Sequence, residues 1–188
     1  MNFLLLQLLS DCQTVNMVEL TNVVVQADLS CSINLSRLAN STRDIKYDPH
    51  KFIGAVWQHR SIGGNCLVFH NGKVNCNGNK TIHQAKKRLR QYARLLQRHG
   101  FAVNLKKIMV VTISAVHRLS SRLNLKDLCE MLSASYNPEL LNAAILKKKR
   151  INFNCFQSGA VVITGIRRMR DLDTVIYPTL LELELCTS

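Results

Sequence analysis

Basic side chains are the most numerous chemically active groups of this chain. Its 188 residues include 25 lysines and arginines against 12 aspartates and glutamates, which gives a formal net charge of +13. No acidic residue occurs between Asp48 and Asp127. This excess indicates a polyanionic partner, such as DNA, RNA or an anionic membrane face. A ribosomal protein, or a soluble protein with an unspecialised basic surface, would have the same composition.

Side chains suited to catalysis or metal binding form no recognisable pattern. The six histidines are scattered, and the chain contains no Ser/His/Asp or phosphate-cradling motif. The seven cysteines are odd in number and include no C-x-x-C pair, which argues against a disulfide framework and against a zinc site. We therefore expect that this protein is not an enzyme and that it binds no cofactor and no metal ion. Most of the cysteines are expected to be small buried apolar groups in a reduced compartment.

The chain contains two copies of one unit in tandem. Four landmarks recur in the same order, with offsets that range from 85 residues (92 to 177) to 90 residues (33 to 123). The pairs are the runs starting at Phe69 and Phe156, the Tyr-x-Pro motifs at 47–49 and 136–138, the Asn-Leu motifs at 33–38 and 123–128, and Tyr92 with Tyr177. A unit of this length exceeds a solenoid repeat and predicts a pseudo-twofold molecule. Duplex DNA, which is itself roughly twofold, suits such a surface.

Each unit is predicted to be a curved antiparallel sheet with one long helix on one face. Alternating apolar residues predict the strands, and a stripe with a period of 3.6 residues predicts the helix at 81–98. The Asn-Gly pair at 71–72 predicts a hairpin. The first unit has predicted strands 20–29, 52–60, 66–69, 73–77 and 101–107, with a short helix at 34–39. The second has strands 109–117, 141–149, 151–157, 160–165 and 179–186, with helices 123–131 and 167–177, the latter ended by Pro178.

The repeat sets the predicted domain boundaries. Residues 18–107 are assigned to the first repeat and residues 108–186 to the second. Residues 1–17 are assigned to an N-terminal extension. Its apolar run is too short to span a bilayer, and it lacks a basic n-region and a clear cleavage site. We interpret it as a short helical or frayed extension.

The motifs of the first unit resemble the core domain of the TATA-box-binding protein family. They are Tyr-x-Pro-x-x-Phe at 47–52, Phe-x-x-Gly-Lys at 69–73 and Tyr-Ala-Arg-x-x-Gln-x-x-Gly-Phe at 92–101. The second unit has Ser-Tyr-Asn-Pro-Glu-Leu at 135–140, where the family has Ser-Tyr-Glu-Pro-Glu-Leu. The resemblance runs from Val18 to Leu185. It implies an α+β fold, a saddle of ten antiparallel strands with two long helices on its convex face.

The resemblance also implies which residues contact DNA. In this family, whose minor-groove binding is an established mechanism, two phenylalanines from each half enter a base step. Here the first pair is Phe52 and Phe69, whereas Leu141 accompanies Phe156 in the second half. Asn22 fits the family's central asparagine, and Thr112 replaces its counterpart. The other groove-lining candidates are Val24, Leu67, Asn77, Val162 and Thr164, while polar residues replace apolar ones at Asn75, Ser114 and Asn154.

Phosphate and protein contacts follow from the same resemblance. The basic helix is expected to lie on the convex face, where regulators and transcription factor IIA bind in the family. Glu139 and Leu140 match positions that meet transcription factor IIB, although Asn137 replaces a glutamate beside them. The implied phosphate contacts are Lys51, Arg60, Lys73, Lys147 and Arg167, and the implied convex contacts are Lys87, Arg90 and Arg94. Gln58 and Ala160 replace two basic residues of the family.

Two functional hypotheses remain. The leading one is a nuclear transcription initiation factor that binds and kinks promoter DNA in the minor groove and recruits basal factors of the RNA polymerase preinitiation complex. The alternative keeps the fold as a regulatory scaffold that binds basal transcription factors, with weakened or non-specific DNA binding. The phenylalanines favour the first hypothesis, and the polar replacements favour the second. Because the first half follows the family pattern more closely, a divergent related factor is expected, with no membrane or small-molecule partner.

Overall fold

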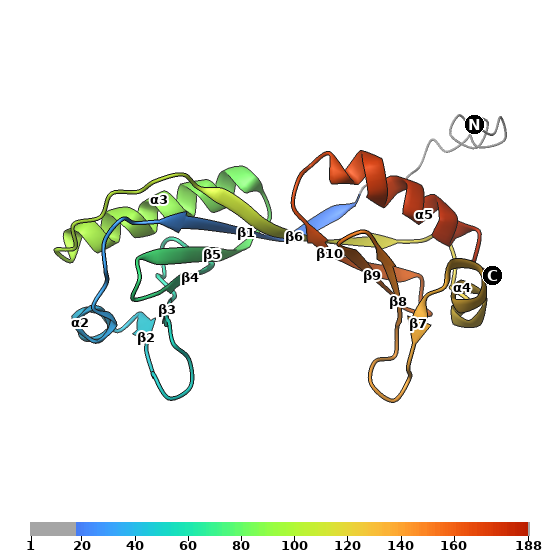
Figure 1. The fold of residues 1–188 in the computed structure, drawn as a ribbon, viewed down its shortest axis with the longest axis horizontal. Helices are drawn as coiled ribbons and strands as arrows, with labels where there is room; N and C mark the ends of the chain where they lie inside the picture. Colours follow the sequence, from blue (N-terminus) through green and yellow to red (C-terminus); the bar gives the residue numbers. More distant parts are fainter. Residues whose placement is uncertain (1–17, 188) are drawn as a thin grey trace.

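The computed structural model describes residues 18–187, so the predicted extension at 1–17 and Cys12 lie outside the described residues. Its centre is one ten-stranded antiparallel sheet in the order β2-β3-β4-β5-β1-β6-β10-β9-β8-β7, arched as seen in Figure 1. The first half contributes β1 (Glu19–Asp28), β2 (Ile45–Lys46), β3 (Ala55–Trp57), β4 (Asn65–Val68) and β5 (Lys73–Asn79). The second contributes β6 (Met109–Arg118), β7 (Ser135–Tyr136), β8 (Ala144–Lys148), β9 (Ile151–Cys155) and β10 (Ala160–Ile166).

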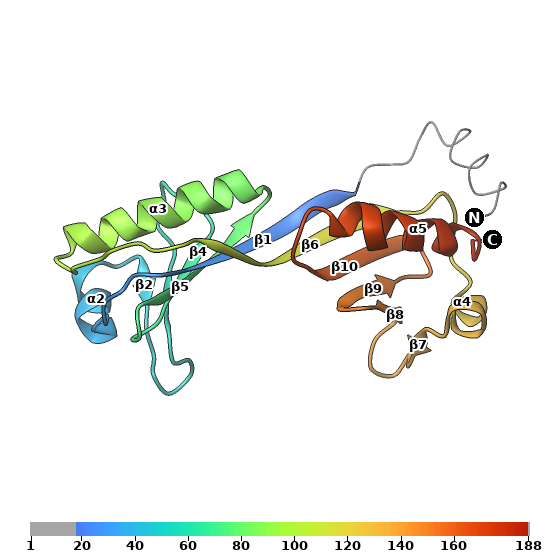
Figure 2. The ribbon, with the colours of Figure 1, turned by 45° about the horizontal axis from the view of Figure 1, so that its top comes forward.

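The helices lie on one face and at the two ends of this sheet. Helix α3 (Ile82–Arg98) covers the first half, and α5 (Tyr177–Glu184), which continues the π-helical turn η1 (Leu172–Ile176), covers the second. The short helices α2 (Leu35–Ser41) and α4 (Leu125–Leu132) lie at opposite ends of the molecule (Figure 2). In Figure 1 the loops after β2 and β7 extend from the side opposite α3 and α5. The predicted α+β saddle is confirmed.

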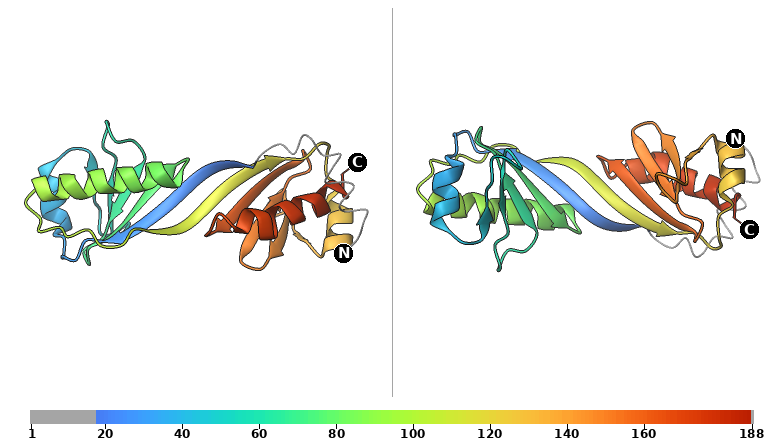
Figure 3. Two further views of the ribbon diagram at one scale, coloured as in Figure 1. Left: turned by 90° about the horizontal axis from the view of Figure 1, so that it is seen from above. Right: turned by 90° about the horizontal axis from the view of Figure 1, so that it is seen from below.

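The two halves repeat one another down to individual hydrogen bonds. The Leu29 N–H donates to the Gly72 carbonyl at 3.0 Å, and the Leu119 N–H donates to the Gly159 carbonyl at 2.9 Å. The sheet is continuous, because β1 pairs antiparallel with β6 between the halves, as Figure 3 shows from above and below. The tandem repeat of the sequence is therefore a repeat of the fold, while the boundary at 107 and 108 stays a prediction.

Helix α3 holds its half of the sheet through a buried apolar stripe. Leu89 and Leu96 are fully buried, as are Val23 and Val25 of β1. The Tyr92 hydroxyl accepts a hydrogen bond from the His59 N–H at 3.2 Å and lies 3.3 Å from the Trp57 carbonyl. Burial raises the pKa of Tyr92 to about 12, so this phenol stays protonated and can donate to that carbonyl. The predicted helix and its stripe are confirmed.

The strand predicted at the end of the chain is wrong. Residues 179–186 form no strand, because α5 continues to Glu184. Ile176, Leu180 and Leu183 recur at helical spacing and are buried, so helical burial overrides the local alternation. Pro178 does not end the helix, because it lies in the first turn of α5, where a missing N–H is tolerated. The predicted helix at 167–177 is therefore displaced along the chain.

Other predicted strands are shorter than expected or absent. Residues 101–107 form no strand, although Asn104 and Lys106 donate to the carbonyls of Leu29 and Asp28. The strands expected at 52–60 and 141–149 shrink to β3 and β8, because loops occupy the residues on both sides of each strand. The two-residue strands β2 and β7 escaped prediction, since two residues cannot display a period.

Candidate nucleic-acid interface

Every second residue of the strands points away from the helices. On β1, Val23 and Val25 are buried under α3, whereas Asn22, Val24 and Gln26 are partly exposed on the opposite side. We call that opposite surface the concave face. Its side chains come from eight strands and the ends of two hairpins. They are Asn22, Val24, Gln26, Val56, Asn65, Leu67, Phe69, Asn75, Asn77, Thr112, Ser114, Val116, Ile145, Lys147, Asn152, Asn154, Phe156, Val162 and Thr164.

An aromatic pair lies at the first-half end of this face. The rings of Phe52 and Phe69 meet edge to face, with centroids 5.9 Å apart and an interplanar angle of 67°. Gly54 lies against both rings, because a Cβ atom there would be 2.9 Å from Cε1 of Phe52 and 3.0 Å from Cε1 of Phe69. Phe52 remains 39% exposed. The fold thus brings the predicted pair together, with Phe52 exposed and Phe69 half-buried.

The second half places Leu141 and Phe156 at equivalent backbone positions. The N–H groups of Phe52 and Leu141 each donate at 3.0 Å, to the carbonyls of Asp48 and Asn137. Phe156 closes its hairpin by donating to the Ala160 carbonyl, as Phe69 does to Lys73. Leu141 is 40% exposed, so an apolar side chain is presented here too. Its insertion into DNA stays a prediction.

The centre of the concave face lies where β1 meets β6. The amide oxygen of Asn22 accepts a hydrogen bond from the Gly78 N–H at 2.9 Å, which leaves the NH₂ group as a donor. Val24 pairs with Thr112 across the two strands. All the other predicted groove-lining residues also lie on this face: Leu67, Asn77, Val162 and Thr164. Their contacts with DNA stay predictions.

Two amides of this face, Gln26 and Asn65, were not predicted from the sequence. Gln26 donates from Nε2 to Oδ1 of Asn75 at 3.0 Å. Gln58, at the end of β3, donates from Nε2 to Oδ1 of Asn65 at 2.8 Å. Oδ1 of Asn77 is buried without a hydrogen-bond partner among the described residues. The strand alternation from Asn22 to Gln26 could have revealed Gln26, whereas the two amide pairs require the strand register.

The five predicted phosphate contacts are exposed. Lys51 lies 3.4 Å from the Asp48 carboxylate, but its side chain is 85% exposed, so this ion pair leaves it available. Lys147 pairs with Asn152 on the concave face, and Lys73 begins β5 beside the aromatic pair. Arg60 lies between β3 and β4, and Arg167 directly follows β10. They form a dispersed set of cations around the face.

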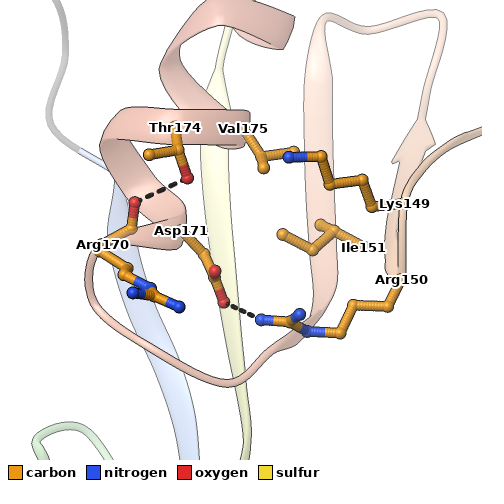
Figure 4. A pocket seen from close by; sticks show the side chains of 7 residues that line it. All are labelled: Lys149, Arg150, Ile151, Arg170, Asp171, Thr174 and Val175. Carbon is orange, nitrogen blue, oxygen red and sulfur yellow. Dashed lines mark hydrogen bonds and ion pairs between the residues drawn. The ribbon is translucent and has the colours of Figure 1, made fainter.

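A buried carboxylate organises the backbone around Arg167. Oδ2 of Asp171 accepts hydrogen bonds from the N–H groups of Arg167 and Arg168 and pairs with Arg150 Nη2 at 2.7 Å. Asp171 and Arg150 are among the residues that line a cleft of about 290 Å³ between the β8–β9 turn and η1 (Figure 4). Burial by itself would raise the pKa of Asp171, but the two N–H groups and the Arg150 guanidinium hold this pKa below its usual value.

Asp171→Asn is expected to lower the free energy of unfolding by about 1–3 kcal/mol at neutral pH, because charge-assisted hydrogen bonds are lost. The folded pKa of Asp171 lies below the unfolded pKa, so the carboxylate stabilises the fold above the unfolded pKa. That contribution is lost as pH falls through the folded pKa. Urea unfolding of both proteins, from neutral pH to about pH 3, measures the difference. A difference independent of pH would contradict the assignment.

The predicted protein contacts are exposed on two other surfaces. Lys87, Arg90 and Arg94 lie on the solvent side of α3, away from the concave face. No acidic residue occurs in this helix. Glu139 and Leu140 lie in the loop after β7, where Leu140 is 84% exposed. These positions are accessible, and their partners stay predictions.

The described residues offer little for other chemistry. Among residues 18–187, no three His, Cys, Asp or Glu side chains are placed to share a metal ion. No helix of that range is long and apolar enough to cross a membrane. Cys66, Cys76, Cys155 and Cys186 are buried free thiols, which confirms the predicted burial of most cysteines. Burial raises the pKa of Cys155 to about 12, so it remains a thiol.

Comparison with known proteins gives matches to both repeats. The sequence model of the family described as "Transcription factor TFIID (or TATA-binding protein, TBP)" matches residues 17–99 and 107–184. TATA-box-binding protein 2 of Arabidopsis thaliana is 32% identical over 170 residues, which cover 87% of this chain and 85% of that protein. The TATA-box-binding protein of Caenorhabditis elegans is also 32% identical, with 87% of this chain and 50% of that protein covered.

Further matches extend to a second kind of relative and to the fold. TATA box-binding protein-like 2 of Rattus norvegicus is 32% identical over 158 residues, covering 82% of this chain and 46% of that protein. The chain thus spans about half the length of the nematode and rat relatives. The solved structure of Methanococcus jannaschii TBP superposes with a TM-score of 0.78 and 26% identity, covering 89% of this chain and 98% of that one. The chain belongs to the TATA-binding protein family of DNA-binding transcription factors.

Proposed function

We propose that this protein binds duplex promoter DNA in the minor groove with its concave face, kinks it, and recruits basal transcription factors in the nucleus. The observation that carries the proposal is the pair of exposed Phe52 and half-buried Phe69, held together beside Gly54 at the end of that face. Such an aromatic pair gains little in the free protein. It becomes useful when it enters a base step whose bases have been unstacked.

The two halves are expected to kink DNA unequally. Phe52 and Phe69 offer two ring faces for stacking, whereas Leu141 offers a smaller side chain without a π-face beside Phe156. Unstacking a step requires roughly a few kcal/mol, which is offset when the bent DNA covers more of the protein. The larger kink should therefore lie under the first half. Between the kinks, the NH₂ group of Asn22 can donate to the minor-groove acceptors of A·T pairs.

Charge supplies the affinity that does not depend on sequence. Each cation that neutralises a phosphate releases counterions, so affinity should fall steeply as salt increases. Lys147 on the concave face and Lys51, Arg60, Lys73 and Arg167 around it are the proposed phosphate contacts. They fix the position of the duplex and leave sequence preference to the side chains of the concave face.

The remaining surfaces are assigned to partners of the preinitiation complex. The basic side of α3, with Lys87, Arg90 and Arg94, fits an acidic protein surface, and we assign it to transcription factor IIA and to regulators. The loop that carries Glu139 and Leu140 is assigned to transcription factor IIB. Through these contacts the bound protein would recruit RNA polymerase, and a nuclear location follows from this activity.

A second candidate function is a regulatory scaffold of the same fold that binds basal factors and grips DNA weakly. The amides Asn75, Asn77 and Asn154 and the hydroxyl of Thr112 favour it, because a less apolar face recovers less free energy when water leaves the interface. The scaffold would use the same α3 surface and the same loop after β7. It differs from the first proposal in whether DNA is bent.

The test is a bending assay on the purified protein. Duplexes with dyes at both ends carry either a TATA element or a G·C-rich control, and energy transfer is recorded across a salt titration. We expect increased transfer on the TATA duplex, which reports bending, together with affinity that falls as salt rises. Equal, unbent and salt-dependent binding to both duplexes would overturn the proposal and favour the scaffold.

A further inference from the structure

The concave face is not the same in its two halves. On β5 the amides facing this surface are Asn75 and Asn77, and the equivalent residues of β10, 87 positions later, are Val162 and Thr164. The partner of Asn75 is Gln26 on β1, whereas the partner of Val162 is Val116 on β6. In the first half, amides therefore occupy the two inner strands β1 and β5, whereas in the second half Val116, Val162 and Thr164 occupy the inner strands and the amides Asn152 and Asn154 lie one strand further out, on β9.

The hydrogen bonds of the amide row leave groups unused. Nε2 of Gln26 donates to Oδ1 of Asn75, so Oε1 of Gln26 keeps both lone pairs and the NH₂ of Asn75 keeps its donors. Oδ1 of Asn77 is an acceptor without a partner among the described residues, although it is buried. An unpaired buried acceptor raises the free energy of the protein unless a donor reaches it. Rotation of this side chain toward a ligand donor would remove that cost.

The minor groove offers one such donor. Its acceptors are common to all base pairs, and the feature that separates G·C from A·T is the 2-amino group of guanine. Against an apolar floor this amino group loses its water without gaining a partner, which disfavours G·C. Against a primary amide it finds a carbonyl acceptor, while the amide NH₂ still serves the ring acceptors of either pair.

We infer that the row Gln26, Asn75 and Asn77 accepts a G·C pair in the half-site under the first repeat, by hydrogen bonding to the guanine 2-amino group. The row lies between the central Asn22 and the aromatic pair, because Asn75 is paired with Leu67, two residues before Phe69 on the same chain segment. The second repeat rejects the same pair, because Val116 and Val162 stand at the equivalent positions and its amides Asn152 and Asn154 lie on the outer strand β9. This inference rests on the proposed minor-groove binding.

Base analogues test the inference by changing the amino group alone. Inosine is guanine without the 2-amino group, and 2,6-diaminopurine is adenine with one. The duplexes carry a symmetric A·T element with one purine position changed in one half-site or in both. Affinity is measured by fluorescence anisotropy and bending by energy transfer, at one fixed salt concentration.

For the wild-type protein, G·C in one half-site is expected to bind within about threefold of A·T, since one amide bond replaces another. Replacing that guanine by inosine should weaken binding about three- to tenfold, the size of one net hydrogen bond. G·C in both half-sites should bind at least about tenfold more weakly than in one, because the second repeat leaves an amino group unpaired.

The variant Asn75→Val with Asn77→Thr gives these two positions of the first repeat the side chains of the second, and Gln26→Val is added so that no amide of the row remains. This variant should bind the duplex with inosine in one half-site more tightly than the duplex with guanine there, the reverse of the wild-type protein. Val162→Asn with Thr164→Asn is the matched opposite change, and it should relieve the penalty of the doubly substituted duplex. The analogue series on the wild type needs no variant, so it holds even if a variant fails to fold.

The outcomes separate the inference from the proposal beneath it. Tighter wild-type binding to inosine than to guanine in the singly substituted duplex, with A·T bending intact, would overturn the inference alone. Failure to bend any duplex, including the A·T element, would overturn both. A 2,6-diaminopurine pair that binds like G·C in one half-site would support the assignment of the amino group as the group recognised.

Discussion

Phe52→Ala combined with Phe69→Ala is expected to abolish bending at the first-half kink and to weaken binding to a TATA duplex by at least about 30-fold. Each ring contributes stacking against a base, and loss of both leaves the unstacked step without compensation. The stability of the free protein should change little, because Phe52 is 39% exposed and contacts Phe69 by an edge. A large loss of DNA affinity with little loss of folding stability is expected of residues that contact DNA and do not support the fold.

The measurement pairs energy-transfer bending with thermal unfolding of the same proteins. Leu141→Ala with Phe156→Ala is the matched variant of the other half, and we expect a smaller loss from it, since leucine stacks less. Leu141→Phe should increase the bend. Equal losses from the two double variants would contradict the proposed asymmetry, and an unchanged bend in the first would contradict the wedge itself.

Gly72→Ala is expected to lower the free energy of unfolding by about 3–5 kcal/mol, the largest stability effect that we predict. Gly72 has φ of +78°, and a Cβ atom there would lie 2.1 Å from the carbonyl oxygen of Cys31. Because that obstacle is backbone, the hairpin and the segment after β1 would have to separate. Gly159→Ala should behave alike, since its Cβ would lie 2.3 Å from the Ser121 carbonyl oxygen.

Gly100→Ala supplies the control for this prediction. Gly100 also has a positive φ, +80°, but the nearest atom to an added Cβ is the mobile Arg37 guanidinium at 3.1 Å. Only the conformational penalty of about 1 kcal/mol should remain there. Chemical denaturation of the three variants compares them directly. If Gly72→Ala cost no more than Gly100→Ala, the backbone contact would not be the reason for this glycine.

Much of the first half could be predicted from sequence because its signals are local. The alternation of β1 and the stripe of α3 match their burial, and the Asn-Gly pair at 71–72 does form the hairpin. Because the sequence is a tandem repeat, the same elements could then be predicted for the second half. The placement of Phe52 beside Phe69 followed from the family spacing, since no local pattern joins residues 17 positions apart (69 − 52 = 17).

The missed features depend on contacts that are distant in sequence. The run 179–186 alternates like a strand, and only its packing against the sheet makes it a helix. Residues 101–107 bond to the end of β1, but too sparsely to form a strand. The amide pairs Gln26–Asn75 and Gln58–Asn65 join different strands, so they appear only once the register is known.

The pairing of β1 with β6 has a consequence for the way the chain is made. The ribosome completes the first half before β6 exists, so β1 then presents an open strand edge. The register of this pair is close to self-complementary, since Asn22 opposite Ser114 and Val24 opposite Thr112 exchange under an offset of 90 residues. A nascent or truncated first half would thus meet its best available partner in a second nascent first half. Once β6 of the same chain is made, it pairs with β1 and closes this edge. Covalent linkage of the two repeats therefore protects the first half against forming dimers and larger aggregates.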